Sequence, residues 1–71
     1  MGKEFRFFIY LLERFAEHRG ESAAETFSRL KSADLLDYAE GMYELYHVES
    51  IDNAFADLDR RLALAERSAF V

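Results

Sequence analysis

Residues 51–67 read IDNAFADLDRRLALAER, and this stretch carries the clearest structural signal in the chain. Its apolar side chains recur at the three- and four-residue intervals of an α-helix. They are Ile51, Ala54, Phe55, Leu58, Leu62 and Ala65. Asp52 stands near the start and Arg67 near the end, which complements the helix dipole, and Asp57 and Arg61 are spaced to form an ion pair on one helix turn. The pattern predicts an amphipathic helix with one narrow apolar face.

Working outward from this stretch, we predict three more helices, at about residues 3–19, 23–31 and 35–47. Gly20 is a natural stop for the first helix. Ser22 and Glu25 have the spacing of a capping box and open the second helix. No stretch alternates with period two, and no two-residue hairpin signal occurs. The sequence therefore predicts an all-α fold, a small bundle of four helices in which short loops make neighbours antiparallel.

The two middle helices each carry an apolar side. The second offers Ala23, Phe27 and Leu30 to the core. The third has an apolar side made of Leu35, Tyr38, Ala39, Met42, Leu45 and Tyr46. Gly41 lies within this third helix at a cost of about 1 kcal/mol relative to alanine. Such a cost indicates either that another helix crosses closely at Gly41, which we favour, or that the glycine stands there by chance.

The first predicted helix has an unusually wide apolar arc, for which two interpretations stay open. Phe5, Phe8, Ile9, Leu12, Phe15 and Ala16 form the arc, and Phe7 and Leu11 widen it. In one interpretation this is the central helix, which all the others contact. In the other, an exposed patch made of Phe7, Tyr10 and Leu11 packs on a second chain, because small cores are enlarged by association.

Length and composition limit the class of protein. With 71 residues, of which 51% are hydrophobic, the chain is expected to be a single helical domain over residues 1–71. It has no Cys and no Pro, so no disulfide can stabilise it. The apolar run at 7–12 is too short for a secretory signal or a membrane span. We therefore expect a cytoplasmic protein with no membrane partner.

Charge is distributed unevenly along the chain. The formal net charge is −5, yet residues 34–59 alone carry eight Asp or Glu and no Lys or Arg. This sign argues against nucleic acid, because the third helix would bring carboxylates to the phosphates. The segment is either a solubilising face or a surface that attracts a basic protein. The candidate partner-binding residues are Asp37, Glu40, Tyr43, Glu44, His47, Glu49 and Asp52.

Catalytic and metal-binding patterns are weak. His47 with Glu44 or Glu49 as its orienting group is the most varied local cluster. The chain has only two histidines, and we find no nucleophile elbow, Gly-rich phosphate loop or calcium-loop spacing. We therefore predict no enzyme activity, no catalytic residue, no cofactor and no metal.

Three segments together resemble a known family. They are Phe7-Phe8, Leu12-Glu13 and Ala16 near the start, MYELYHVE at 42–49, and Ala54-Phe55 with Asp57-Leu58-Asp59. The likeness covers roughly residues 5–62 and is most distinctive in the last two segments. The family comprises short bacterial helical proteins of unknown function, about 60–75 residues long. The chain departs from the family pattern near 29–34, where a glycine usually helps the turn, and at Gly41.

The resemblance implies a binding role and provides no catalytic residues. Some members are encoded beside predicted ADP-ribosyltransferase-like toxins, which implies an antitoxin-like or accessory partner. We therefore expect a non-catalytic protein–protein interaction module, for which the resemblance implies a toxin-type enzyme as the partner. The alternatives are a self-associating homodimeric domain and, as a weaker hypothesis, a small DNA-binding regulator.

Overall fold

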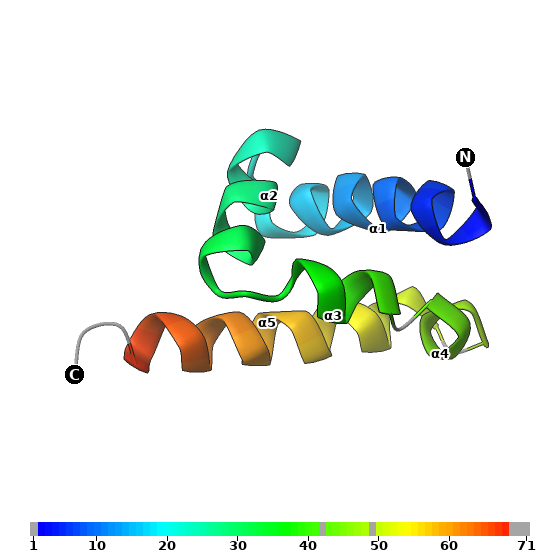
Figure 1. Ribbon diagram of the computed structural model, residues 1–71. Helices are drawn as coiled ribbons and strands as arrows, with labels where there is room; N and C mark the ends of the chain where they lie inside the picture. Colours follow the sequence, from blue (N-terminus) through cyan, green and yellow to red (C-terminus); the bar gives the residue numbers. More distant parts are fainter. Residues whose placement is uncertain (1, 42, 49, 69–71) are drawn as a thin grey trace.

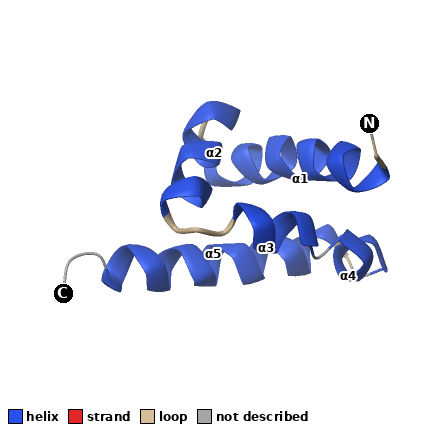
Figure 2. Ribbon diagram, in the orientation of Figure 1, coloured by secondary structure: helices blue, strands red, loops and turns tan. Residues whose placement is uncertain are grey.

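The apolar stripe of residues 51–67 forms the longest helix of the structure, α5 (Ile51–Ser68). The structure is a computed structural model that describes residues 2–41, 43–48 and 50–68 (Figure 1). The other helices are α1 (Lys3–Arg19), α2 (Ala23–Ser32), α3 (Leu36–Gly41) and α4 (Tyr43–Val48). The described residues contain no strand (Figure 2). The predicted all-α fold is confirmed.

The helices form two layers. Figure 1 shows α1 and α5 running in the same direction, while α3 returns in the opposite direction beside α5. α2 stands across the end at which α1 finishes, and α4 lies at the other end of the molecule. α1 contacts all of α2, α3, α4 and α5. This supports the interpretation of α1 as the central helix.

Local signals set the C-terminal end of α1 and the start of α2 as predicted. Gly20 adopts the left-handed conformation with φ of 71°, and its N–H and that of Glu21 donate to the last carbonyls of α1 at 3.1 and 2.9 Å. At the start of α2, the Glu25 N–H donates to Ser22 Oγ at 3.1 Å. The Ser22 N–H donates to Glu25 Oε1 at 3.2 Å, which completes the capping box.

The turn from α2 to α3 contains a residue in the left-handed conformation. Asp34 has a φ of 60°, in the left-handed region that favours glycine. The Leu35 N–H donates to the Leu30 carbonyl at 2.8 Å and closes the turn. Aspartate tolerates this conformation better than most residues. Asp34 therefore takes the position in this turn that a glycine would favour.

One connected apolar core joins the two layers. Its members are Phe8, Leu11, Leu12, Phe15, Leu30, Ala39, Ala54, Phe55, Leu58 and Leu62. The stripe predicted on α5 is confirmed, because the side chains of four of its members are buried. Most of the wide apolar arc of α1 packs against the other helices of the same chain, since five of its residues are buried.

The predicted core face of α2 is partly wrong. Leu30 is buried as expected, but Ala23 and Phe27 are exposed and Thr26 is fully buried instead. The Thr26 hydroxyl donates to Glu21 Oε1 at 2.9 Å, so its polar group is satisfied inside the fold. This hydrogen bond allows α2 to turn a threonine, rather than a phenylalanine, towards α1.

The region predicted as one helix over 35–47 is occupied by α3 and α4. Met42 between them, and the side chains of Leu45 and Tyr46, lie outside the described residues. The close helix crossing predicted at Gly41 is not found among the described residues, because a Cβ placed there would meet none of their atoms within 4 Å outside its own helix and its chain neighbours. α3 instead buries Ala39, on another side of the helix. None of the helices formed by the described residues is long and apolar enough to cross a membrane.

Candidate functional site

Two of the carboxylates in the acidic segment 34–59 are used within the fold. Asp57 accepts hydrogen bonds from the Tyr38 hydroxyl at 2.7 Å, from Arg60 at 2.9 Å and from Arg61 at 3.1 Å. The Arg61 guanidinium also lies 4.0 Å from the centre of the Tyr38 ring. The predicted ion pair between Asp57 and Arg61 is therefore confirmed, and it belongs to a cluster that ties α3 to α5.

Asp59 connects the end of α1 to α5. Its Oδ1 accepts from Arg19 Nη1 at 2.7 Å, and its Oδ2 lies 2.8 Å from His18 Nε2. The His18 ring stacks on Phe55, with centroids 4.8 Å apart and planes at 21°. Asp59 is thus a structural carboxylate, whose partners come from about 40 residues earlier in the chain.

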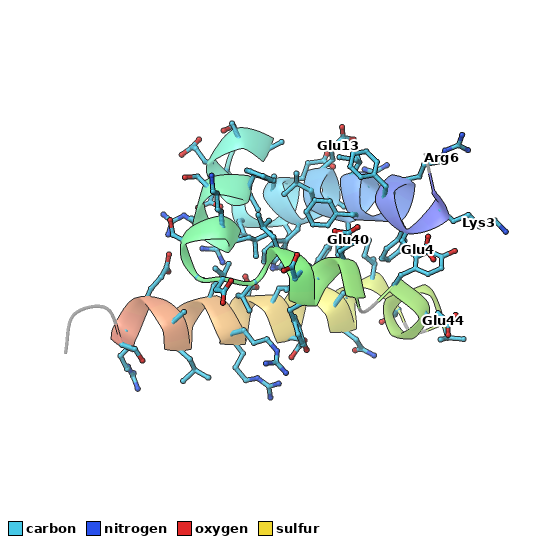
Figure 3. The ribbon with its side chains drawn as sticks, viewed as in Figure 1. Lys3, Glu4, Arg6, Glu13, Glu40 and Glu44 are labelled. Atoms are coloured by element: carbon cyan, nitrogen blue, oxygen red, sulfur yellow. The ribbon has the colours of Figure 1, made fainter. Side chains whose placement is uncertain are left out.

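Other carboxylates of the segment face solvent. Within residues 2–41, 43–48 and 50–68, no ion pair is formed by Asp37, Glu40, Glu44 or Asp52. All four are exposed. We call these four residues the acidic patch. In Figure 3, Glu40 lies on the side of α3 nearer α1, and Glu44 lies at the outer end of α4.

The acidic patch spans three helices. Asp37 and Glu40 belong to α3, Glu44 to α4 and Asp52 to the first turn of α5. α3 contacts α4, and α4 contacts α5, so the helices that carry the four carboxylates are neighbours. Like charges close together repel one another. None of the four carboxylates is relieved of that repulsion by an ion pair with a cation among the described residues.

The aromatic part of the predicted surface is anchored to α1. Tyr43 is half-buried, and its ring meets the Phe7 ring edge-on at 5.3 Å and 79°. This contact fixes α4 against the start of α1 beside the acidic patch. Two predicted members of the surface, the His47 side chain and Glu49, lie outside the described residues.

The residues predicted for self-association do not share an exposed face. Leu11 is buried in the core of the single chain. Phe7 is half-buried against Tyr43, and Tyr10 is exposed with the Arg14 guanidinium 5.6 Å from its ring centre. In addition to Tyr10, the large apolar side chains of α1 that are exposed are Phe5 and Ile9.

A series of linked ion pairs, which we call the ion-pair chain, joins α1 and α2 to α5, and sequence reasoning missed it. Glu21 Oε1 accepts from Arg19 Nε at 3.0 Å, and Glu21 Oε2 lies 2.6 Å from Arg29 Nε. Arg19 continues to Asp59, and Arg29 continues to Glu66 at 2.7 Å. The two end members of this ion-pair chain, Asp59 and Glu66, therefore both belong to α5. No local spacing predicts these pairs, because their members come from α1, the loop, α2 and α5.

Glu21 is the central group of the ion-pair chain. Burial by itself raises the pKa of its carboxyl group, but hydrogen bonds from Thr26 and Arg19 and the charges of Arg19 and Arg29 outweigh that effect. The net result is a pKa below the ordinary value of 4.5. Glu21 is therefore held in its charged form, as a structural group.

A shallow groove of about 420 Å³ lies where α2 rises from the end of α1. It is lined by Tyr10, Glu13, Arg14, Ala16, Glu17, Glu21 and Ala23. Its charged members include Arg14 and Glu17, which pair with each other at 3.1 Å. The groove brings together no set of three His, Asp or Glu side chains arranged for a metal ion, as judged over the described residues.

Comparison with known proteins places the chain in a family without an assigned role. The family model described as "Protein of unknown function (DUF3791)" matches residues 6–63. No curated protein and no solved structure matches the chain. The matched range contains all the helices from α1 to α4 apart from the first residues of α1, together with most of α5.

Proposed function

The chain belongs to the DUF3791 family of proteins of unknown function, and we propose that it is a non-catalytic module that binds another protein. The acidic patch of Asp37, Glu40, Glu44 and Asp52 is the surface that engages a basic partner. The observation that carries this proposal is that the fold neutralises Asp57 and Asp59 but leaves the acidic patch without cations among the described residues.

The contrast between these two groups of carboxylates supports a binding role. The chain has nine Lys and Arg residues, and several of them are committed to carboxylates elsewhere in the fold. An exposed field of one sign increases the rate at which an oppositely charged protein finds its site. Tyr43, whose ring packs against Phe7, lies beside the acidic patch. Aromatic side chains such as this one are enriched at protein–protein interfaces.

The resemblance described above narrows the class of partner. Relatives encoded beside ADP-ribosyltransferase-like toxins suggest that the partner is a toxin-type enzyme and that the chain is antitoxin-like or accessory. We place this interaction in the bacterial cytoplasm, with which the absence of cysteine is compatible. Binding then acts by covering a surface of the enzyme, because the proposal assigns no chemistry to the chain itself.

Affinity capture from the native host tests the binding proposal. The bait is the wild-type chain, compared with the variant Glu40→Gln/Glu44→Gln, which removes two charges while nearly conserving side-chain shape. We expect one basic protein to be retained by the wild type and to be strongly reduced with the variant. Equal recovery with both baits, or no protein specific to the wild type, would contradict the proposal.

Co-expression tests the narrower antitoxin-like role. The product of a neighbouring toxin-type gene is expressed alone, with the wild-type chain, and with the Glu40→Gln/Glu44→Gln variant. We expect the wild type to restore growth and the variant to restore it less well at equal protein level. Toxicity that is unchanged by the wild-type chain would exclude this role, while leaving binding to a different basic protein to the capture experiment.

A further inference from the structure

One apolar row of α1 is covered at one end only. Phe5, Ile9, Leu12 and Ala16 follow one another at intervals of four, three and four residues, so they lie along one face of the helix. Their exposed fractions are 42%, 38%, 8% and 3%. The exposure falls towards the end of α1 where α2 packs (Figure 1). The uncovered half of the row consists of Phe5 and Ile9.

Two opposite charges stand beside this uncovered half. Arg6 and Glu13 are both exposed and form no ion pair within the part of the chain that the structure describes. Both point away from α5 in Figure 3. They are seven residues apart, so they lie two turns apart on nearly the same side of the helix, separated by about 10.5 Å along its axis.

We propose that a second copy of the chain docks on this face, with its α1 antiparallel to the first. The midpoint between Arg6 and Glu13 falls at residues 9–10, beside Ile9. A twofold axis at that point sets Arg6 opposite the partner's Glu13 and Glu13 opposite the partner's Arg6. The same axis brings the two copies of Ile9 into contact. The apolar contact between the two α1 helices then extends along the row to Phe5.

Charge determines the direction of this packing. A parallel arrangement with a twofold axis along the helices places Arg6 and the partner's Glu13 on opposite flanks of the helix pair, so neither ion pair forms. The antiparallel arrangement places them on the same flank and forms both attractive pairs. This face of α1 differs from the acidic patch, which lies on α3, α4 and α5. An experiment can therefore disprove one of the two proposed interactions without bearing on the other.

Reciprocal charge exchange is the decisive test. The oligomeric state of the wild-type chain is measured by sedimentation equilibrium over a wide concentration range. Arg6→Glu converts two attractive pairs into repulsive ones and is expected to raise the dissociation constant of the dimer on the order of tenfold. Arg6→Glu/Glu13→Arg restores both pairs in exchanged form and is expected to restore the dimer.

Two controls separate this proposal from general effects. Arg67→Glu changes the charge by the same amount at an exposed position on α5 and is expected to leave the dimer unchanged. Far-ultraviolet circular dichroism of each variant checks that the helices are intact. A monomeric wild type at all concentrations, an Arg6→Glu variant that dimerises as the wild type does, or a double variant that stays monomeric would each overturn the proposal.

Discussion

Glu21 lies at the centre of the ion-pair chain that joins α1 and α2 to α5, and Glu21→Gln tests whether that chain stabilises the fold. The Glu21 side chain is only 12% exposed. Its two oxygens receive Arg19 Nε at 3.0 Å, Thr26 Oγ1 at 2.9 Å and Arg29 Nε at 2.6 Å. Glutamine has the same shape but keeps one acceptor oxygen, and its amide NH₂ group points a donor at another donor.

The magnitude follows from the hydrogen bonds that change. A hydrogen bond to a charged group contributes about 1.5–3 kcal/mol, against about 1 kcal/mol for a neutral one. Arg19 and Arg29 keep Asp59 and Glu66 as partners, so neither is stranded without a counter-charge. Arg29 is also partly exposed, and solvent screens its contribution. We therefore expect Glu21→Gln to lower the free energy of unfolding by about 2 kcal/mol.

The effect has a definite dependence on pH. Because the pKa of Glu21 is lowered in the folded chain, its charge stabilises the fold above the unfolded pKa. That stabilisation is lost as the pH falls through the lower, folded pKa. Glutamine does not titrate. The difference in stability between the wild type and Glu21→Gln is therefore largest near neutral pH and narrows below the ordinary value of 4.5.

Urea unfolding followed by circular dichroism measures both quantities. The matched control is Glu17→Gln, which makes the same chemical change in an exposed ion pair with Arg14 and is expected to cause a much smaller loss. Equal losses in the two variants at neutral pH would refute the structural role of Glu21. A difference between the wild type and Glu21→Gln that stays constant in acid would refute the pKa argument.

Three further substitutions test the packing and the turns, each by urea unfolding against the wild type. Leu58→Ala empties a fully buried position and is expected to cost about 2–4 kcal/mol, whereas Leu64→Ala, at an exposed position on the same helix, is expected to change stability little. Asp34→Gly relieves the left-handed backbone and is expected to add about 0.5–1 kcal/mol; a loss would contradict the turn geometry. Gly41→Ala adds a Cβ that meets no atom of another described element within 4 Å and is expected to add up to about 1 kcal/mol; a loss would indicate a close neighbour at that position.

Features with local causes were predictable from the sequence. The C-terminal end of α1 and the start of α2 depend on Gly20 and on the Ser22–Glu25 capping box, which act within a few residues. The buried face of α5 follows from its helical periodicity. The pair of Asp57 and Arg61 lies within one turn of a helix, so its spacing predicts the contact.

Features with distant causes were not predictable. Thr26 is buried because Glu21, outside the helix, accepts a hydrogen bond from its hydroxyl, and a pattern of apolar residues cannot include such a partner. Asp59 is neutralised by Arg19 from 40 residues away. The total charge of residues 34–59 therefore did not distinguish the structural carboxylates from the acidic patch, and only the folded geometry separates them.

The rate at which the captured basic protein associates with the chain tests the central claim most directly. The rate constant is measured over a range of ionic strength for the wild type, Glu40→Gln and the control Glu17→Gln. We expect Glu40→Gln to slow association about two- to threefold at low ionic strength, with the difference disappearing at high salt. Association that is equally fast for Glu40→Gln and Glu17→Gln at every ionic strength would contradict a partner-binding role for the acidic patch.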